Sequence, residues 1–236
     1  MQLDNLKKEL QDLADPERAK SSQRYFKTGV GEYAEGDIFI GLTNPLLRTI
    51  AKKYPGLNYQ EIQELLSSKI HEYRFAALLI LVHKYKKAKK DRFEKRKIYE
   101  FYMKNTRNIK NWDLVDCSAP HIVGDFLQSE GTEILKSLAK SENLWERRIA
   151  ILSTFPFIKK NQFGETLAIS EMLIDDEHDL IHKAVGWALR EVGKKNINVL
   201  ELFLMPRYKT MPRTMLRYAI EKFPEEKRQD YLKGKV

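Results

Sequence analysis

A helical pattern that recurs five times along the chain constrains its fold more than any other feature. The copies share a form in which a charged or aromatic residue, in most of them followed by a basic residue, precedes a small residue within an apolar run. The copies read EYRFAALLILVHKY, NWDLVDCSAPHIV, LWERRIAILSTF, LIHKAVGWALREV and PRTMLRYAIEKF. Their alignment brings five small residues into register, at spacings of about 40, 33, 36 and 33 residues: Ala77, Cys117, Ala150, Gly186 and Ala219. Small residues at one helix position predict that each of these helices packs closely against a neighbour.

The period of this pattern is typical of helical-hairpin repeats of the HEAT and armadillo kind. Strand signals are scarce, and four apolar-periodic segments between the copies supply the outer helices of the pairs: DRFEKRKIYEFYMK, GTEILKSLAK, GETLAISEMLI and NVLELFLM. We therefore predict an all-α fold in a single domain over residues 1–236, a curved α-solenoid of HEAT-like repeats. Such a fold offers a long concave groove and no deep pocket.

One segment, TGVGEYAEGDIFIGLTNP at residues 28–45, breaks the helical pattern. Its four glycines and the alternating DIFIGL stretch predict a loop or a short β-hairpin. Asn44 is then the expected N-cap of the next helix, with Pro45 at the first helical position. This insertion either connects two helices or probes a groove of a bound nucleic acid.

The composition narrows the classes of function. A net charge of +9 and a pI near 9.4 indicate a polyanionic partner, most often nucleic acid, although a basic surface can also serve solubility alone. No long apolar run predicts a membrane span, and the charged start of the chain predicts an amphipathic helix in place of a signal peptide. A single cysteine, Cys117, excludes an internal disulfide. We expect a bacterial-type cytoplasmic protein.

The histidines give no metal signature. His178 and His182 are four residues apart, but no HExxH-type glutamate accompanies them, so a polar helix face is the better interpretation. We expect neither a metal nor another cofactor.

Basic side chains recur in four of the five aligned segments. If the inner helices line the concave face, these residues could follow a phosphate backbone: Arg74, Arg147, Arg148, Lys183, Arg190, Arg213 and Arg217. We interpret the denser basic stretch at 83–97 as solvated surface. Groove binding of this kind needs only a monomer.

The second segment also carries an unexpected carboxylate. Trp112 and Asp116 are four residues apart, which places an indole and a carboxylate side by side on one helix. Asp113 is the rival carboxylate, but it points about 100° away and is expected to face solvent or cap the helix. A lone helical Asp often serves structure only, by binding a nearby backbone N–H or an arginine.

Together the motifs NWDLVD, LWERRIAI and HKAVGWALRE, preceded by QRYFK and NPLLR, resemble those of the AlkD-like DNA alkylation-repair glycosylases over essentially the whole chain. The resemblance implies that Asp116 is the catalytic carboxylate and that Trp112 and Trp187 are aromatic residues beside it. It further implies that Arg148 lies near the DNA backbone at the lesion and that the Tyr25 hydroxyl faces the same site. The 28–45 segment is longer than in the best-characterised relatives, and insertions of this kind accompany binding of branched or distorted DNA.

These roles suit the chemistry of a purine alkylated at N3 or N7, which is already cationic and needs no general acid. A carboxylate would stabilise the positive charge that develops on the deoxyribose, and Arg148 would keep Asp116 ionised. Three functions therefore compete: an alkylpurine glycosylase that uses no base-flipping pocket, a non-catalytic binder of branched DNA, and a protein–protein scaffold. The basic residues and tryptophans disfavour the scaffold. DNA binding would associate the protein with the nucleoid.

Overall fold

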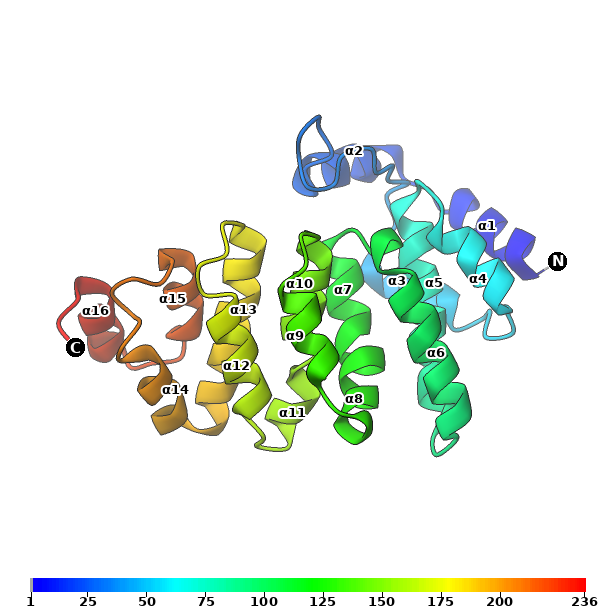
Figure 1. Cartoon of the computed structure of the whole chain (residues 1–236). Coiled ribbons are helices and arrows are strands. Elements are labelled where there is room, and N and C mark those ends of the chain that lie inside the picture. Colours follow the sequence, from blue (N-terminus) through cyan, green and yellow to red (C-terminus); the bar gives the residue numbers. More distant parts are fainter. Residues whose placement is uncertain (1) are drawn as a thin grey trace. The chain divides into compact units, whose positions relative to one another are not determined.

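The computed structural model describes residues 2–236, and all of the regular elements in this range are helices. The chain divides into two compact units, which meet in sequence between Ser118 and Ala119 (Figure 1). The predicted all-α helical fold is confirmed. The single domain predicted over residues 1–236 stays a prediction. Within the described range no helix is long and apolar enough to cross a membrane.

The N-terminal unit contains α1 to α6, a 3₁₀ turn (η1) and the start of α7. Their bounds are α1 Gln2–Asp12, α2 Pro16–Tyr25, α3 Asn44–Ala51, α4 Tyr59–Leu66, α5 His71–Ala88, α6 Arg92–Lys104, η1 Thr106–Asn108 and α7 Trp112–Ala119. Helices α3, α4 and α6 all pack on α5, which is therefore the centre of this unit. The expected amphipathic N-terminal helix is confirmed, because α1 buries its leucines at helical spacing: Leu3, Leu6 and Leu10.

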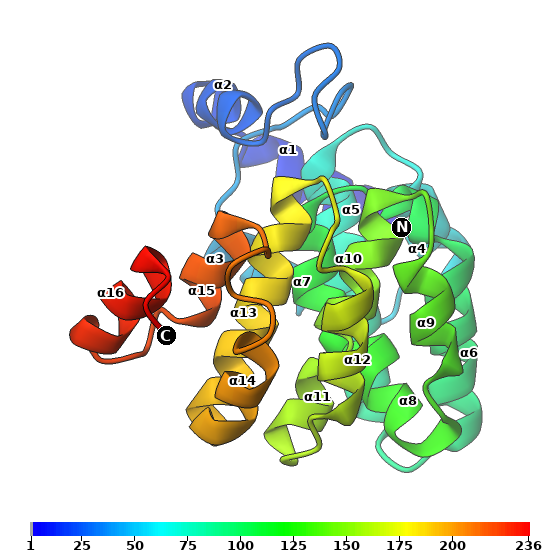
Figure 2. The same ribbon diagram turned by 60° about the vertical axis from the view of Figure 1, so that its left-hand side comes forward.

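The C-terminal unit begins with a π-helical turn and continues through nine α-helices. Their bounds are η2 Pro120–Gly124, α8 Asp125–Glu130, α9 Glu133–Ala139, α10 Leu144–Leu152, α11 Phe155–Lys159, α12 Gly164–Met172, α13 Asp179–Lys195, α14 Ile197–Leu204, α15 Arg213–Ala219 and α16 Glu225–Lys233. Helix α13 is the centre of this unit and packs against α10, α12, α14 and α15 (Figure 2).

The five small residues of the repeat are all buried. Gly186 shows the reason most clearly, because a Cβ atom added there would lie 2.5 Å from the carbonyl oxygen of Met215 and 2.5 Å from the Cβ of Tyr218. Helices α13 and α15 therefore approach each other almost backbone to backbone, which only glycine permits.

The 28–45 segment forms a loop and not a hairpin. Its one bridge is parallel and joins Ile38 to Ile70, the residue before α5. Gly41 has φ +88°, and a Cβ atom there would lie 2.1 Å from the carbonyl oxygen of Asp15, so the loop passes tightly under the start of α2. The expected N-cap is wrong by one residue. Thr43 caps α3 by accepting from the Leu46 N–H at 3.4 Å, and Asn44 is already helical.

Candidate functional site

Helix α7 presents the predicted indole and carboxylate at its N-terminal half. Trp112 is the first residue of the helix, and its backbone N–H donates to the side chain of Asn111 at 2.8 Å. Asp116 follows one turn later, and both side chains are half-buried, whereas Leu114 and Val115 between them are fully buried. The helix therefore keeps the Trp112–Asp116 edge accessible while its other face holds the core.

An aromatic wall of Tyr25, Phe26, Phe39 and Trp112 forms beside this edge. The Phe26 ring stacks on Trp112, with centroids 5.3 Å apart, and on Phe39 at 4.8 Å. Tyr25, at the end of α2, meets Trp112 edge-on at 6.2 Å and keeps 68% of its surface exposed. Tyr25 therefore contacts Trp112 within the N-terminal unit, and its role at a DNA site stays a prediction.

The inserted loop also contacts Trp112 directly. The Trp112 indole N–H donates to the Tyr33 hydroxyl, and this bond lowers the pKa of Tyr33, although burial of the ring raises that pKa by more. With Phe26 stacked on one face and Tyr33 bound to its nitrogen, the indole has a fixed orientation. The loop is therefore a part of the wall and not only a connection.

A buried group of charges lies under the wall, here called the His71 cluster: Asp37, His71, Arg74, Lys110 and Asp113. The Nε2 atom of His71 lies 2.9 Å from Oδ2 of Asp113, and its Nδ1 lies 3.7 Å from Oδ2 of Asp37. Asp37 also accepts from Nη2 of Arg74 at 2.5 Å, and Lys110 Nζ lies 3.2 Å from its other oxygen. The cluster joins the loop, α5 and the first turn of α7 through charged contacts.

The cluster is charged at neutral pH. Burial lowers the pKa of His71, but the charge of Asp113, the hydrogen bond with Asp113 and the nearby carboxylate of Asp37 outweigh it and raise the pKa to about 8. Burial raises the pKa of Asp37, but the nearby His71 ring and the charges of Arg74 and Lys110 leave it below its usual value. Because His71 is a cation near pH 7, both of its neighbouring carboxylates have a compensating charge.

Two expectations are corrected here. Asp113, expected to face solvent or cap α7, is 5% exposed and paired with His71. Arg74, expected to contact DNA, is 1% exposed, because its guanidinium donates to Asp37 and to the backbone carbonyls of Ser68 and Lys69. The loop covers both residues, and helical register alone does not reveal such a cover.

Glu72 fixes the other end of the loop. Its buried carboxylate accepts from the consecutive backbone N–H groups of Ile40, Gly41 and Leu42 at 3.1, 2.8 and 3.3 Å. Sequence reasoning missed this residue and also missed four others: Phe26, Asp37, Phe39 and His71. The signal available was the pair His71–Glu72 directly before a continuous apolar run, where charged side chains have no solvent to face.

The second predicted group of site residues lies in the C-terminal unit. Trp187 on α13 is half-buried and meets Phe155 edge-on at 4.8 Å. Arg148 on α10 is 5% exposed, and its Nη1 donates to the carbonyl of Leu180 at 2.6 Å. Arg148 therefore joins α10 to the start of α13. That Trp187 and Arg148 act together with Asp116 stays a prediction.

The remaining predicted DNA-binding residues also lie in the C-terminal unit, and most have internal partners. Arg147 donates to Asp176 at 2.6 Å, Lys183 pairs with Asp179 at 2.6 Å, and Arg190 pairs with Glu221. Arg213 donates to the carbonyl of Leu232 at 2.8 Å, and Arg217 is exposed. Their contact with DNA stays a prediction.

The histidine pair has structural contacts at the start of α13. Nδ1 of His178 accepts from the Leu180 N–H at 3.1 Å and caps the helix, and the ring of His182 hydrogen-bonds to the carbonyl of Asp176. Across residues 2–236 no group of three or more His, Cys, Asp or Glu residues could hold a metal ion.

Comparison with known proteins gives one family and several similar folds. A family model described as "DNA alkylation repair enzyme" matches residues 6–223. A solved structure described as a predicted DNA alkylation repair enzyme from Enterococcus faecalis has a TM-score of 0.69 and 19% identity, covering 90% of this chain and 97% of that one. The structure of AlkD2 from Streptococcus mutans has a TM-score of 0.57 and 18% sequence identity, and the match covers 86% of this chain and 99% of that one. At these identities the solved structures show a shared fold. No curated protein gives a significant match.

Proposed function

Because the chain belongs to the DNA alkylation repair enzyme family, with DNA as its partner, we propose that it is a DNA glycosylase for cationic N3- and N7-alkylated purines in duplex DNA. The observation that carries this proposal is the accessible edge of α7, where Asp116 and the fixed indole of Trp112 stand one turn apart. The chemistry needs no cofactor, since the alkylated base is already an activated leaving group.

Asp116 is the group that acts on the reacting sugar. As the N-glycosidic bond breaks, positive charge develops on the deoxyribose, and a nearby carboxylate stabilises it and orients the attacking water. Loss of one such electrostatic contribution costs on the order of 10²–10³ in rate. The carboxylate does not have to protonate the base, so its ionised form is the active one.

The aromatic residues hold the cationic nucleotide. The faces of indole rings carry negative quadrupole density and attract cations, which suits Trp112 from α7 and Trp187 from α13. Tyr25 presents its exposed hydroxyl at the edge of the wall. Because the rings of the wall are already held by stacking and hydrogen bonding, their side chains would lose little conformational entropy on binding.

The basic residues bind the DNA backbone. In this proposal Arg148 binds a phosphate that flanks the lesion, and Arg147, Lys183, Arg190, Arg213 and Arg217 bind further phosphates. Recognition then depends on the backbone and on the charge of the lesion, without a base-flipping pocket, so a neutral lesion should be cut more slowly than a cationic one. The protein acts as a monomer on nucleoid DNA in the cytoplasm.

A non-catalytic binder of branched DNA is the second candidate, and the loop tip favours it. Val30 is 94% exposed there, and an exposed apolar side chain can wedge between unstacked bases. However, the tip also carries Glu32 and Glu35, whose carboxylates accept from the backbone N–H groups of Gly29 and Gly31 at 2.8 Å. Two negative charges at the tip oppose insertion into DNA, so the glycosylase is the better-supported function.

Release of methylpurines from methylated duplex DNA distinguishes the glycosylase from the binder of branched DNA. Wild type should release the base, and Asp116→Asn should lower the rate on the order of 10²–10³ while DNA affinity stays near wild type. Asp175→Asn, which makes the same chemical change at an exposed position, serves as the control and should behave as wild type. Absence of release by wild type, with preference for four-way junctions over linear duplex, would establish the second candidate instead.

A further inference from the structure

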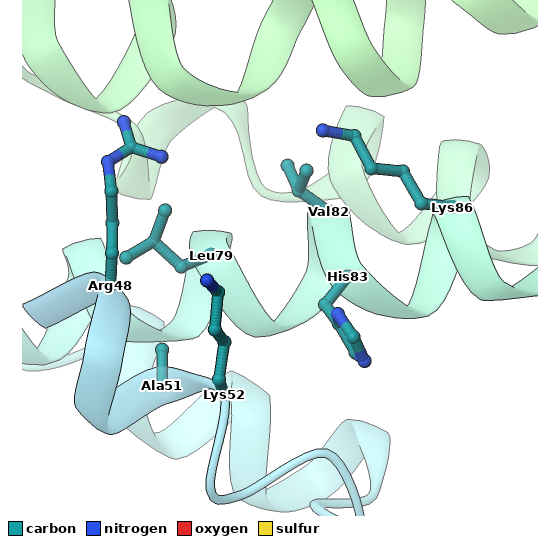
Figure 3. Close-up of a pocket in the computed structure, with 7 residues that line it drawn as sticks. All are labelled: Arg48, Ala51, Lys52, Leu79, Val82, His83 and Lys86. Carbon is teal, nitrogen blue, oxygen red and sulfur yellow. The ribbon is translucent and has the colours of Figure 1, made fainter.

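A pocket of about 280 Å³ lies between α3 and α5, and no residue of the aromatic wall lines it (Figure 3). Four basic residues line it: Arg48 on α3, Lys52 directly after the end of α3, and His83 and Lys86 on α5. All four are exposed, and no acidic residue contributes to the lining. Positive charge therefore gathers here without a carboxylate to balance it.

This lack of balance distinguishes the pocket from the predicted DNA-binding residues. Arg147, Lys183 and Arg190 each have a carboxylate partner within their own unit. Within residues 2–236 neither Arg48 nor Lys86 forms an ion pair, and the same holds for Lys52 and His83. An anion that binds in the pocket would therefore displace no existing partner.

The floor of the pocket is apolar. Ala51, Leu79 and Val82 line it and are 4%, 8% and 7% exposed. In Figure 3 the side chains of Arg48 and Lys86 extend to the same side of the helices as this floor, and so does Lys52 between them, whereas the ring of His83 turns the opposite way. A ligand held here meets cations at its edges and methyl groups beneath.

That combination fits the sugar–phosphate backbone of nucleic acid better than it fits a free inorganic anion. Phosphate oxygens suit Arg48, Lys52 and Lys86, and the C–H surface of a deoxyribose suits Leu79 and Val82. Inorganic phosphate would use the cations and leave the apolar floor uncovered. A small apolar ligand would leave the cations without an anion.

The pocket and the proposed catalytic helix belong to the same unit. Burial raises the pKa of the Cys117 thiol on α7, and the positive charge of Arg48 acts in the opposite direction. Cys117 directly follows Asp116 in the chain. The pocket and the accessible edge of α7 thus belong to one compact unit.

We propose that the α3–α5 pocket is a subsite for the sugar–phosphate backbone of a DNA strand, which it holds while the damaged nucleotide lies at Asp116. This inference rests on the proposed function, which supplies DNA as the ligand, but it concerns residues outside the α7 site. The subsite adds affinity without reading sequence or lesion. The chemical step stays with α7.

The test is the salt dependence of duplex binding. A variant carrying Arg48→Gln, Lys52→Gln and Lys86→Gln should bind unmodified duplex at least about tenfold more weakly at low salt. Its plot of log affinity against log salt should be shallower by about 2–3 units, because each lost phosphate contact removes about 0.9. Base release at saturating DNA should remain near wild type.

A matched variant controls for net charge. Lys87→Gln, Lys89→Gln and Lys90→Gln remove three exposed cations that lie beyond the pocket lining at the end of α5. This variant should change the slope by less than half as much. Equal slopes in the two triple variants, or an unchanged slope in the pocket variant, would overturn the subsite.

Two further results separate the outcomes. Loss of inorganic phosphate binding in the pocket variant with an unchanged DNA slope would make the pocket a small-anion site and refute the proposal. If wild type releases no base but the pocket variant still shows the shallower salt dependence of duplex binding, the glycosylase proposal is refuted and the subsite proposal is supported.

Discussion

Arg74 on α5 and Lys183 on α13 each lie three residues before the small residue of their repeat, but they and the charged residues near them have different surroundings in the two units. In the N-terminal unit Arg74 on α5 and Asp113 on α7 are buried and belong to the His71 cluster. In the C-terminal unit Lys183 and Arg190 on α13 stay half-exposed and pair with carboxylates near the surface. The same register thus gives a structural charge in one unit and an accessible charge in the other.

The inserted loop accounts for the difference. In the N-terminal unit it brings Asp37 to the start of α5 and lays Phe39 over His71, at a centroid distance of 4.5 Å. The cover removes solvent from the charges, so they must pair with one another. Exposed pairs on α13 lose little when they break, and they remain available to a phosphate. An insertion can therefore change the role of a repeat position without changing its residue type.

The largest expected effect comes from breaking the buried cluster. Arg74→Met should lower the free energy of unfolding by about 3–5 kcal/mol, because Asp37 keeps its charge in a buried place and loses its closest partner. Urea denaturation followed by circular dichroism measures this. Arg217→Met on α15, at an exposed position, is the control and should cost less than about 0.5 kcal/mol. Equal costs would show that the two units do not differ as described.

A second, smaller effect is a pH dependence specific to the N-terminal unit. The folded pKa of His71, about 8, lies above its ordinary value of 6.5, so its contribution to stability is complete below pH 6.5 and is lost as pH rises through 8. The loss amounts to about 2 kcal/mol, since one pKa unit corresponds to about 1.36 kcal/mol. Unfolding free energies measured across this window should fall in wild type.

Two histidine variants isolate the cause. His71→Asn should remove the fall between pH 6.5 and 8, and His83→Asn, at an exposed position, should retain it. Burial lowers the pKa of His178, so that residue changes stability only below its usual value and does not contribute in this window. If the free energy of unfolding still falls between pH 6.5 and 8 in His71→Asn, deprotonation of His71 is not the cause of the fall.

Periodicity predicted the helices and their close contacts, because both depend on local spacing. The apolar runs around Ala77 and Gly186 are helical, and the small residues lie at helix contacts. The roles of Arg74 and Asp113 were not predictable in this way, since they depend on a loop that is distant in sequence. The grouping of basic residues at the pocket was not predictable for a similar reason. Arg48 and Lys86 lie far apart in the chain, and the sequence around Lys86 favours a solvated surface.

The smallest expected effect tests whether the exposed pairs in the C-terminal unit serve DNA binding. Lys183 pairs with Asp179 one turn earlier on α13, and side-chain hydrogen bonding to Asp179 raises the pKa of the lysine. Both side chains are about half exposed, so Lys183→Gln should change the free energy of unfolding by less than about 0.5 kcal/mol. The same substitution should reduce the salt slope of duplex binding by about 1 unit if Lys183 contacts a phosphate.

Asp179→Asn removes the carboxylate partner of Lys183 and should leave that slope unchanged or make it steeper. If Lys183→Gln instead lowered stability as much as Arg74→Met and left the slope unaltered, the exposed pairs would be structural, and the distinction between the two units would lie only in depth of burial.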